Sequence, residues 1–251
     1  MQNGKWFITH METQEQKTRL IAFHHAGGSA SAFRCWQKHI SSDIAICPAI
    51  LPSHDSRVSE SYPDSIQTLA ETLVTENEEF LSEKRLVIYG HSMGAVLAFE
   101  TAAAAQRHGI VPYALIVSGE TAPKDTVLKK ESRNMNEQEF IELLRDYAGM
   151  DTDLLENKEF MKYYYPIVRG DFIFYESYVP DEPFQLQCPI CVINGREDKH
   201  ISMERIEDWK YYSSVKTDCI LTEGGHFFSF ERPEEICGII NEYLSKGINH
   251  E

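Results

Sequence analysis

The sequence predicts an α/β protein with a mostly parallel, doubly wound sheet. Six short apolar runs have the length of buried strands, and longer polar or helix-forming stretches separate them. Parallel strands need such crossover connections, which are usually helical. With 251 residues and 42% hydrophobic residues, the chain can form a sizeable core. We therefore expect one domain over residues 1–251.

The first three predicted strands lie in the N-terminal third of the chain. The first covers residues 19–23 and leads through a small-residue loop to a helix beginning near Ser31. The second covers residues 44–47. A helix over residues 65–81 follows, because its apolar positions recur at helical spacing and Ser65 can cap it. The third strand, residues 86–89, precedes an alanine-rich helix.

The second half of the chain predicts three further strands and one long insertion. The strands cover residues 113–119, 191–194 and 219–221. The span between the first two of these is too long for one crossover helix, so residues 121–185 are predicted to form a helical lid over the carboxyl edge of the sheet. Its aromatic residues could line an acyl channel or pack the lid onto the core.

A Gly-x-Ser-x-Gly motif lies between the third strand and its helix. Gly90, Ser92 and Gly94 have the spacing of a sharp strand-to-helix turn that pushes the central side chain outward. Ser92 is therefore the candidate nucleophile. A serine between two glycines can also be an ordinary turn, but the strand before it and the helix after it favour the catalytic interpretation.

Two later loops supply candidates for the base and its orienting acid. Asp198 follows the predicted strand at 191–194, and His226 follows two glycines after the strand at 219–221. A serine nucleophile needs a base and a group that orients this base. The chain order Ser92, Asp198, His226 is that of α/β-hydrolases. We therefore predict an α/β-hydrolase fold.

The loop after the first strand is the candidate oxyanion site. In α/β-hydrolases one donor is the N–H of the residue after the nucleophile, here Met93, and the other comes from this loop, here Ala26 or Gly27. The glycines could instead serve only to turn the chain. His24 and His25 are interpreted as structural, because His226 fills the base position.

Composition excludes several other classes of protein. The net charge of −15 disfavours nucleic acid or an anionic membrane as partner. We find no signal peptide or apolar run of membrane-spanning length, so we expect a cytoplasmic protein. Cys188 and Cys191 have redox or zinc spacing, but no second pair completes a zinc site, and the six cysteines are interpreted as reduced core thiols.

Four stretches resemble the signatures of the type II thioesterases that accompany nonribosomal peptide and polyketide synthases. They are residues 25–30 (His-Ala-Gly-Gly-Ser-Ala), 90–95 (Gly-His-Ser-Met-Gly-Ala), 195–198 (Gly-Arg-Glu-Asp) and 225–228 (Gly-His-Phe-Phe). Residues 169–172 also resemble a lid segment of that family, and Trp6 and Phe7 its N-terminal lead. The chain departs from the family at Ser53, His54 and Asp55, where a Gly-Arg-Glu-like stretch is usual.

The resemblance implies hydrolysis of acyl or aminoacyl thioesters from the phosphopantetheine arm of carrier domains, which removes stalled or aberrant chains. It implies acyl or peptidyl carrier domains as partners. The proposed chemistry requires no cofactor and no metal, the charge argues against nucleic acid and membrane partners, and we expect a monomer. A carboxylesterase or lipase acting on free small esters needs the same three residues and remains the alternative. A third hypothesis is a binding protein that kept this fold without catalysis.

Overall fold

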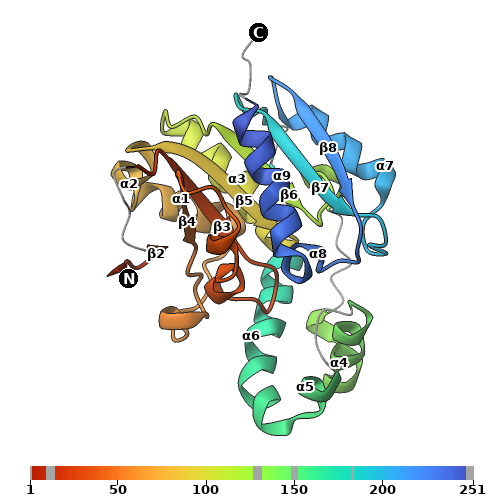
Figure 1. Cartoon of the computed structure of the whole chain (residues 1–251). Helices are drawn as coiled ribbons and strands as arrows, with labels where there is room; N and C mark the ends of the chain where they lie inside the picture. Colours follow the sequence, from red (N-terminus) through yellow and green to blue (C-terminus); the bar gives the residue numbers. More distant parts are fainter. Residues whose placement is uncertain (1, 10–14, 127–131, 148–151, 182–183, 247–251) are drawn as a thin grey trace.

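A six-stranded parallel sheet forms the centre of the molecule (Figure 1). The computed structural model describes residues 2–9, 15–126, 132–147, 152–181 and 184–246. The strand order is β4-β3-β5-β6-β7-β8, and every neighbouring pair is parallel. The predicted doubly wound α/β sheet is confirmed. The strands are β3 (Thr18–Phe23), β4 (Ile44–Pro48), β5 (Arg85–His91), β6 (Ala114–Ser118), β7 (Ile190–Gly195) and β8 (Thr217–Thr222).

Successive strand residues are buried in two different cores, one on each face of the sheet. Val87 and Tyr89 of β5 belong to one core, and Leu86 and Ile88 belong to the other. This burial on both faces explains why the strands read as continuous apolar runs. Helices α1 (Ile66–Thr75), α2 (Glu78–Ser82) and α3 (Met93–Arg107) cover one face, and α9 (Pro233–Ser245) crosses the other (Figure 1).

Two predicted helices differ from those observed. The helix expected near Ser31 is replaced by two short 3₁₀ segments, η1 (Ala30–Phe33) and η2 (Trp36–Lys38). Residues three apart face the same side of a 3₁₀ turn, so Phe33 and Trp36 are both buried against the sheet. The helix expected over 65–81 is interrupted at Asn77, whose side chain donates to the carbonyl of Leu73. The predicted cap is confirmed, since Ser65 accepts the N–H of Thr68.

In the described part of the segment between β6 and β7, three α-helices extend beyond the carboxyl ends of the strands (Figure 1). These are α4 (Glu137–Asp146), α5 (Thr152–Glu156) and α6 (Lys158–Glu176). A small core of their own includes Phe140 and Val168. The boundaries of the domain (1–251) and of the lid (121–185) stay predictions, and parts of the lid lie outside the described residues.

None of the helices in the described ranges is long and apolar enough to cross a membrane.

The remaining elements are short. A two-stranded ribbon, which sequence reasoning missed, precedes the main sheet. The short elements are β1 (Gln2–Asn3), β2 (Ile8–Thr9), η3 (Asp55–Arg57), η4 (Pro123–Asp125), η5 (Ser132–Asn134), α7 (Met203–Ile206), η6 (Glu207–Tyr212) and α8 (Phe228–Glu231).

Candidate active site

The turn between β5 and α3 holds Ser92 in a backbone conformation that few residues other than glycine adopt. Its φ is 55° and its ψ is −124°. A Cβ atom at Gly90 would overlap the carbonyl group of Gly94, and one at Gly94 would lie 2.6 Å from the carbonyl oxygen of His24. The two glycines are therefore needed for the tight turn and for the close approach of α3 to the loop after β3.

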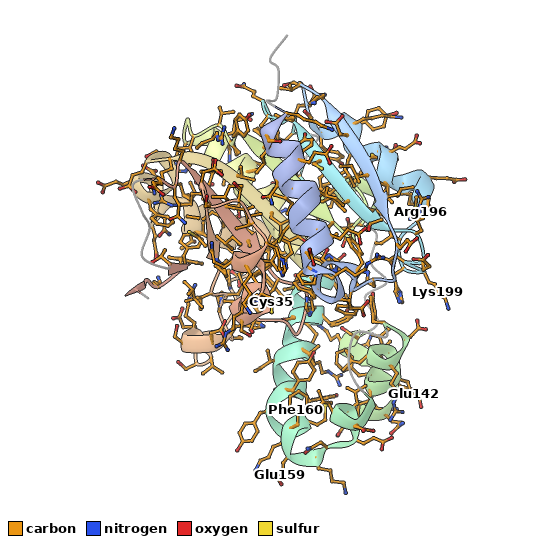
Figure 2. All side chains as sticks on the ribbon, viewed as in Figure 1. Cys35, Glu142, Glu159, Phe160, Arg196 and Lys199 are labelled. Carbon is orange, nitrogen blue, oxygen red and sulfur yellow. The ribbon has the colours of Figure 1, made fainter. Side chains whose placement is uncertain are left out.

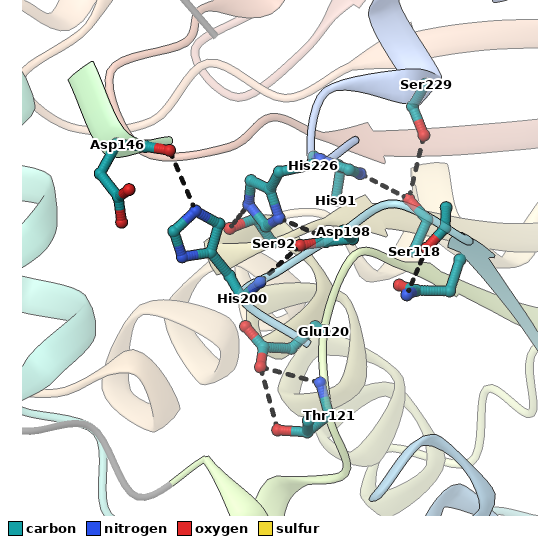
Figure 3. A network of polar contacts seen from close by, with 12 residues as sticks. His91, Ser92, Ser118, Glu120, Thr121, Asp146, Asp198, His200, His226 and Ser229 are labelled. Carbon is teal, nitrogen blue, oxygen red and sulfur yellow. Dashed lines mark hydrogen bonds and ion pairs between the residues drawn. The ribbon is translucent and has the colours of Figure 1, made fainter. Parts of the chain in front are cut away.

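Ser92, His226 and Asp198 form one chain of hydrogen bonds (Figure 3). His226 Nε2 lies 3.0 Å from Ser92 Oγ, and His226 Nδ1 lies 2.8 Å from Oδ2 of Asp198. An ionised carboxylate only accepts hydrogen bonds, so Nδ1–H donates to Asp198 and Nε2 is left to accept the serine proton. The structure thus brings the three predicted residues together in the arrangement that nucleophilic catalysis by serine requires.

The loop that carries Asp198 contains two further polar residues with different partners. The backbone N–H of His200 donates to Oδ1 of Asp198 at 2.9 Å. The imidazole ring of His200 stacks on Tyr147, with the ring centres 3.9 Å apart. The Glu197 carboxylate accepts the backbone N–H of Gly224. Of the two neighbouring carboxylates, Asp198 is the one that accepts from the imidazole of His226, as the sequence predicted.

The loop after β3 lines the cavity that contains Ser92. The structure distinguishes its two predicted oxyanion donors, Ala26 and Gly27, by their hydrogen bonds. Gly27 N–H donates to Oδ2 of Asp171 at 2.6 Å, so the expected role of Gly27 is corrected: its N–H already has a strong acceptor. Ala26 lines the same cavity and is left as the candidate donor of this loop. Met93 is the first residue of α3, where an N–H has no partner within the helix.

A buried charged cluster connects this loop to helix α6. Oδ2 of Asp171 accepts from Gly27 and from His54 Nε2 at 3.0 Å, and Oδ1 accepts the hydroxyl of Tyr62 at 2.9 Å. His54 Nδ1 lies 2.9 Å from the carbonyl oxygen of Pro52, so both ring nitrogens face acceptors. Burial lowers the pKa of His54, but the hydrogen bond to Asp171 and its negative charge outweigh this effect and raise the pKa.

Sequence reasoning assigned no role to either partner of this pair. His54 stands in the stretch where the chain departs from the family pattern, and Asp171 stands in the resembling segment 169–172. Both side chains are almost completely buried, with 2% of His54 and 0% of Asp171 exposed. A buried ion pair is destabilising to break, because the remaining charge has no partner. The departure at His54 therefore places a basic side chain, hydrogen-bonded to Asp171, against the lid helix.

Two cavities meet at the candidate catalytic residues. Both are lined by Ser92 and His226 and by two tyrosines, Tyr147 and Tyr175. The first is mainly apolar and extends between the loop after β3 and the lid, where its wall includes Leu144, Tyr164, Phe172 and Phe227. The second is polar, with a wall that includes Glu120, Thr121, Asp125, Thr126, Ser202 and Arg205.

Some of the lid aromatics line a cavity and others pack the lid onto the core, and an acyl channel stays a prediction. Tyr164, Phe172 and Tyr175 line the apolar cavity. Phe174 and Tyr178 are buried in the core beneath α6 and hold the helix on the sheet. A single helix therefore provides a wall of the cavity on one side and a packing surface on the other.

Glu120 is a buried carboxylate in the wall of the polar cavity. It is 4% exposed, and it accepts hydrogen bonds from the hydroxyl of Tyr175 and from the N–H and hydroxyl of Thr121. Burial raises the pKa of the Glu120 carboxyl, although these hydrogen bonds act in the opposite direction. Figure 3 shows Glu120 with its hydrogen bonds to Thr121, below His200 in this view.

The two histidines of the loop after β3 and the two spaced cysteines have shifted pKa values. His24 is buried, and His25 is half-buried and lines the apolar cavity. Burial lowers the pKa of His24 to about 4 and that of His25 to about 3. Cys188 and Cys191 are free and buried, and burial raises the pKa of the Cys188 thiol to about 12. A protonated buried thiol is a poor nucleophile and a poor metal ligand.

The sheet, the turn at Ser92 and the chain order of Ser92, Asp198 and His226 define an α/β-hydrolase fold. Residues 18–244 match the model of the thioesterase domain family. The chain is 30% identical to thioesterase PikA5 of Streptomyces venezuelae over 243 residues, covering 96% of this chain and 86% of that protein.

A second curated relative, named linear gramicidin dehydrogenase LgrE, of Brevibacillus parabrevis, is 30% identical over 245 residues, covering 96% and 93% of the two chains. The solved structure of YbtT, a type II thioesterase from the yersiniabactin NRPS/PKS biosynthetic pathway, has 30% identity and a TM-score of 0.85, with 97% and 99% of the chains covered. The chain therefore belongs to the thioesterase family, and the resemblance to type II thioesterases is confirmed.

Proposed function

We propose that this protein is a serine thioesterase that hydrolyses acyl or aminoacyl groups from the phosphopantetheine arm of carrier domains, and so removes stalled or aberrant chains. The hydrogen-bonded chain of Ser92, His226 and Asp198 at the meeting point of two cavities carries the proposal. Membership in the thioesterase family and the similarity to proteins of natural-product pathways support it.

The proposed reaction begins with proton transfer from Ser92 to His226 Nε2 as the serine oxygen attacks the thioester carbonyl. Asp198 holds the imidazole in the required tautomer and stabilises its cation. The N–H groups of Met93 and Ala26 stabilise the oxyanion, and the protonated imidazole then donates its proton to the leaving thiolate. Water, deprotonated by the same imidazole, hydrolyses the acyl-serine and completes the cycle.

A carboxylesterase acting on free esters uses the same residues and differs only in the leaving group. Turnover of an acyl-pantetheine thioester should therefore be compared with that of the oxygen ester of the same acyl group. We expect the thioester to have the higher kcat/KM after correction for its spontaneous hydrolysis. A preference for the oxygen ester would favour the esterase alternative.

Two other functions are tested by simpler measurements. A binding protein without catalysis would leave Ser92 unreactive toward a fluorophosphonate, whereas the proposed enzyme should be labelled there. The name of one relative contains the word dehydrogenase, but the geometry around Ser92 and His226 favours acyl transfer over hydride transfer.

Carrier domains are proposed as partners, and the charge of this chain limits how they would bind. Residues 196–199 read Arg-Glu-Asp-Lys, so two positive charges are offset by two negative ones. Figure 2 shows Arg196 and Lys199 at the surface of this loop. Carrier domains are commonly acidic. Because this protein has a total charge of −15, it would not attract such a domain from a distance, and docking would rest mainly on apolar contacts.

A further inference from the structure

The polar cavity beside Ser92 contains the buried carboxyl group of Glu120. Burial raises the pKa of this group, and the positive charge of a protonated His226 lowers it by a smaller amount. Glu120 is almost completely buried, and within the described part of the chain no Lys or Arg forms an ion pair with it. Arg205 lines the same cavity, but its charge acts on Asp125. Glu100 and Glu176 are also buried and accept hydroxyl groups, so burial alone does not distinguish Glu120. Glu120 differs from them because it lines a cavity together with Ser92.

The hydrogen bonds to Glu120 favour its ionised form once a cation is present. Three donors, one from Tyr175 and two from Thr121, point at the two carboxylate oxygens. A protonated carboxyl group would offer its own O–H in place of one lone pair and would match these donors less well. Burial opposes ionisation of Glu120, so an ammonium group in this cavity would act together with the three donors in favour of the carboxylate.

On the basis of the proposed thioesterase function, we infer that the polar cavity binds the amino group of an aminoacyl substrate and that Glu120 is the residue that selects it. The carbonyl carbon of the substrate must lie next to Ser92 Oγ for attack, and the α-amino group is two bonds from that carbon. Ser92 and Glu120 line one cavity, so an ammonium group attached there enters the space in front of the carboxylate.

The apolar cavity can hold the rest of the aminoacyl group. The Cα atom of an aminoacyl group carries an amine and a side chain, and the two cavities open from the same point at Ser92 and His226. The amine would enter the polar cavity and an apolar side chain the other, between Leu144 and Phe172. A plain acyl group has nothing to place beside Glu120 and leaves that carboxylate without a cation.

The test compares two nearly isosteric substrates, alanyl-pantetheine and isobutyryl-pantetheine thioesters, in which a methyl group replaces the ammonium group. Each kcat/KM is divided by the rate of spontaneous hydrolysis of the same substrate, because an ammonium group also activates the neighbouring carbonyl. We expect the corrected kcat/KM of the wild-type protein to be at least about tenfold higher for the alanyl thioester, the usual effect of a hydrogen bond to a charged group. Glu120→Gln should lower this ratio to near one by slowing hydrolysis of the alanyl substrate, with little change for the isobutyryl substrate.

Glu100→Gln is the matched control. Glu100 is also a buried carboxylate that accepts a tyrosine hydroxyl, that of Tyr178 at 2.7 Å, and burial raises the pKa of Glu100 as well. It lies on α3 and lines a different cavity, which Ser92 does not reach. Its substitution should leave the substrate ratio unchanged, so a general effect of losing a buried carboxylate is separated from recognition.

Each remaining result overturns the inference in a different way. Equal losses on both substrates in Glu120→Gln would show that Glu120 supports the imidazole or the fold instead of the amine. A wild-type ratio of one or lower would refute the selection of amines whether or not the variant folds. If the wild-type protein hydrolysed neither thioester above background, the proposed thioesterase function itself would fall.

Discussion

Replacing Asp171 by asparagine should destabilise the protein in a way that depends on pH. The carboxylate of Asp171 accepts from Gly27, His54 and Tyr62 in a fully buried position. An asparagine of the same size has one accepting oxygen, and its NH₂ group would face one of these donors. At a pH where His54 is protonated, the substitution also leaves its buried positive charge without a counter-charge.

The magnitude follows from these two losses. Breaking a buried ion pair by removing one partner costs about 3–5 kcal/mol of folding free energy. Where His54 is neutral, the loss is that of an unsatisfied buried donor, about 1–3 kcal/mol. Because the folded-state pKa of His54 is raised, the stabilisation by the pair is fully present below its unfolded value of roughly 6.5 and is lost as pH rises through the folded value.

Urea unfolding of the wild type and of Asp171→Asn at pH 6 and pH 9 would measure the effect. We expect the loss of unfolding free energy to be larger at pH 6 than at pH 9. Glu176→Gln is the control, since Glu176 is a buried carboxylate of the same helix whose donors come from Ser132 and not from a histidine. An equal loss at the two pH values, or a larger one at pH 9, would refute the charged state of His54.

The remaining predictions concern the triad, the turn and the partner. Ser92→Ala should keep its circular dichroism spectrum and lose several orders of magnitude in kcat; parental turnover would disprove the nucleophile. Asp198→Asn should lower kcat by roughly 10³-fold or more, whereas Glu197→Gln and His200→Gln should be mild; the reverse would reassign the acid. Gly94→Ala should shift the urea midpoint to lower concentration, because its Cβ would overlap the backbone after β3; an unchanged midpoint would contradict this steric requirement. Hydrolysis of an acyl-carrier substrate should lose less than about threefold in rate between low and physiological salt, and a steep salt dependence would show a basic docking patch.

The strands and the triad could be predicted because their signals are local. Residues 86–89 are apolar on both faces of β5, and the Gly-x-Ser-x-Gly spacing fixes the turn that follows. The helix breaks were missed because they depend on one competing interaction, such as the side-chain bond from Asn77 to Leu73. Helix propensity describes the average preference of each residue type, so it cannot predict one specific side-chain to backbone hydrogen bond.

The polar residues around the triad could not be predicted, since their partners are distant in sequence. Asp171 and Gly27 are 144 residues apart, and Tyr175 and Glu120 are 55 apart. A glutamate at position 120 or an aspartate at position 171 reads as an ordinary surface residue until the lid is placed on the sheet. Burial and partner choice here are properties of the tertiary structure, and the sequence pattern contains neither.

Helix α6 combines these distant contacts in one rigid element. Tyr164, Val168, Asp171 and Tyr175 follow the spacing i, i+4, i+7 and i+11, so they share one face of the helix. The first two lie against Gly27, the third binds its N–H and the fourth binds Glu120. A displacement of α6 would therefore change the oxyanion loop and the walls of both cavities together. The lid would then act on catalysis and on substrate selection through the same movement, and neither property can be altered by moving the helix without affecting the other.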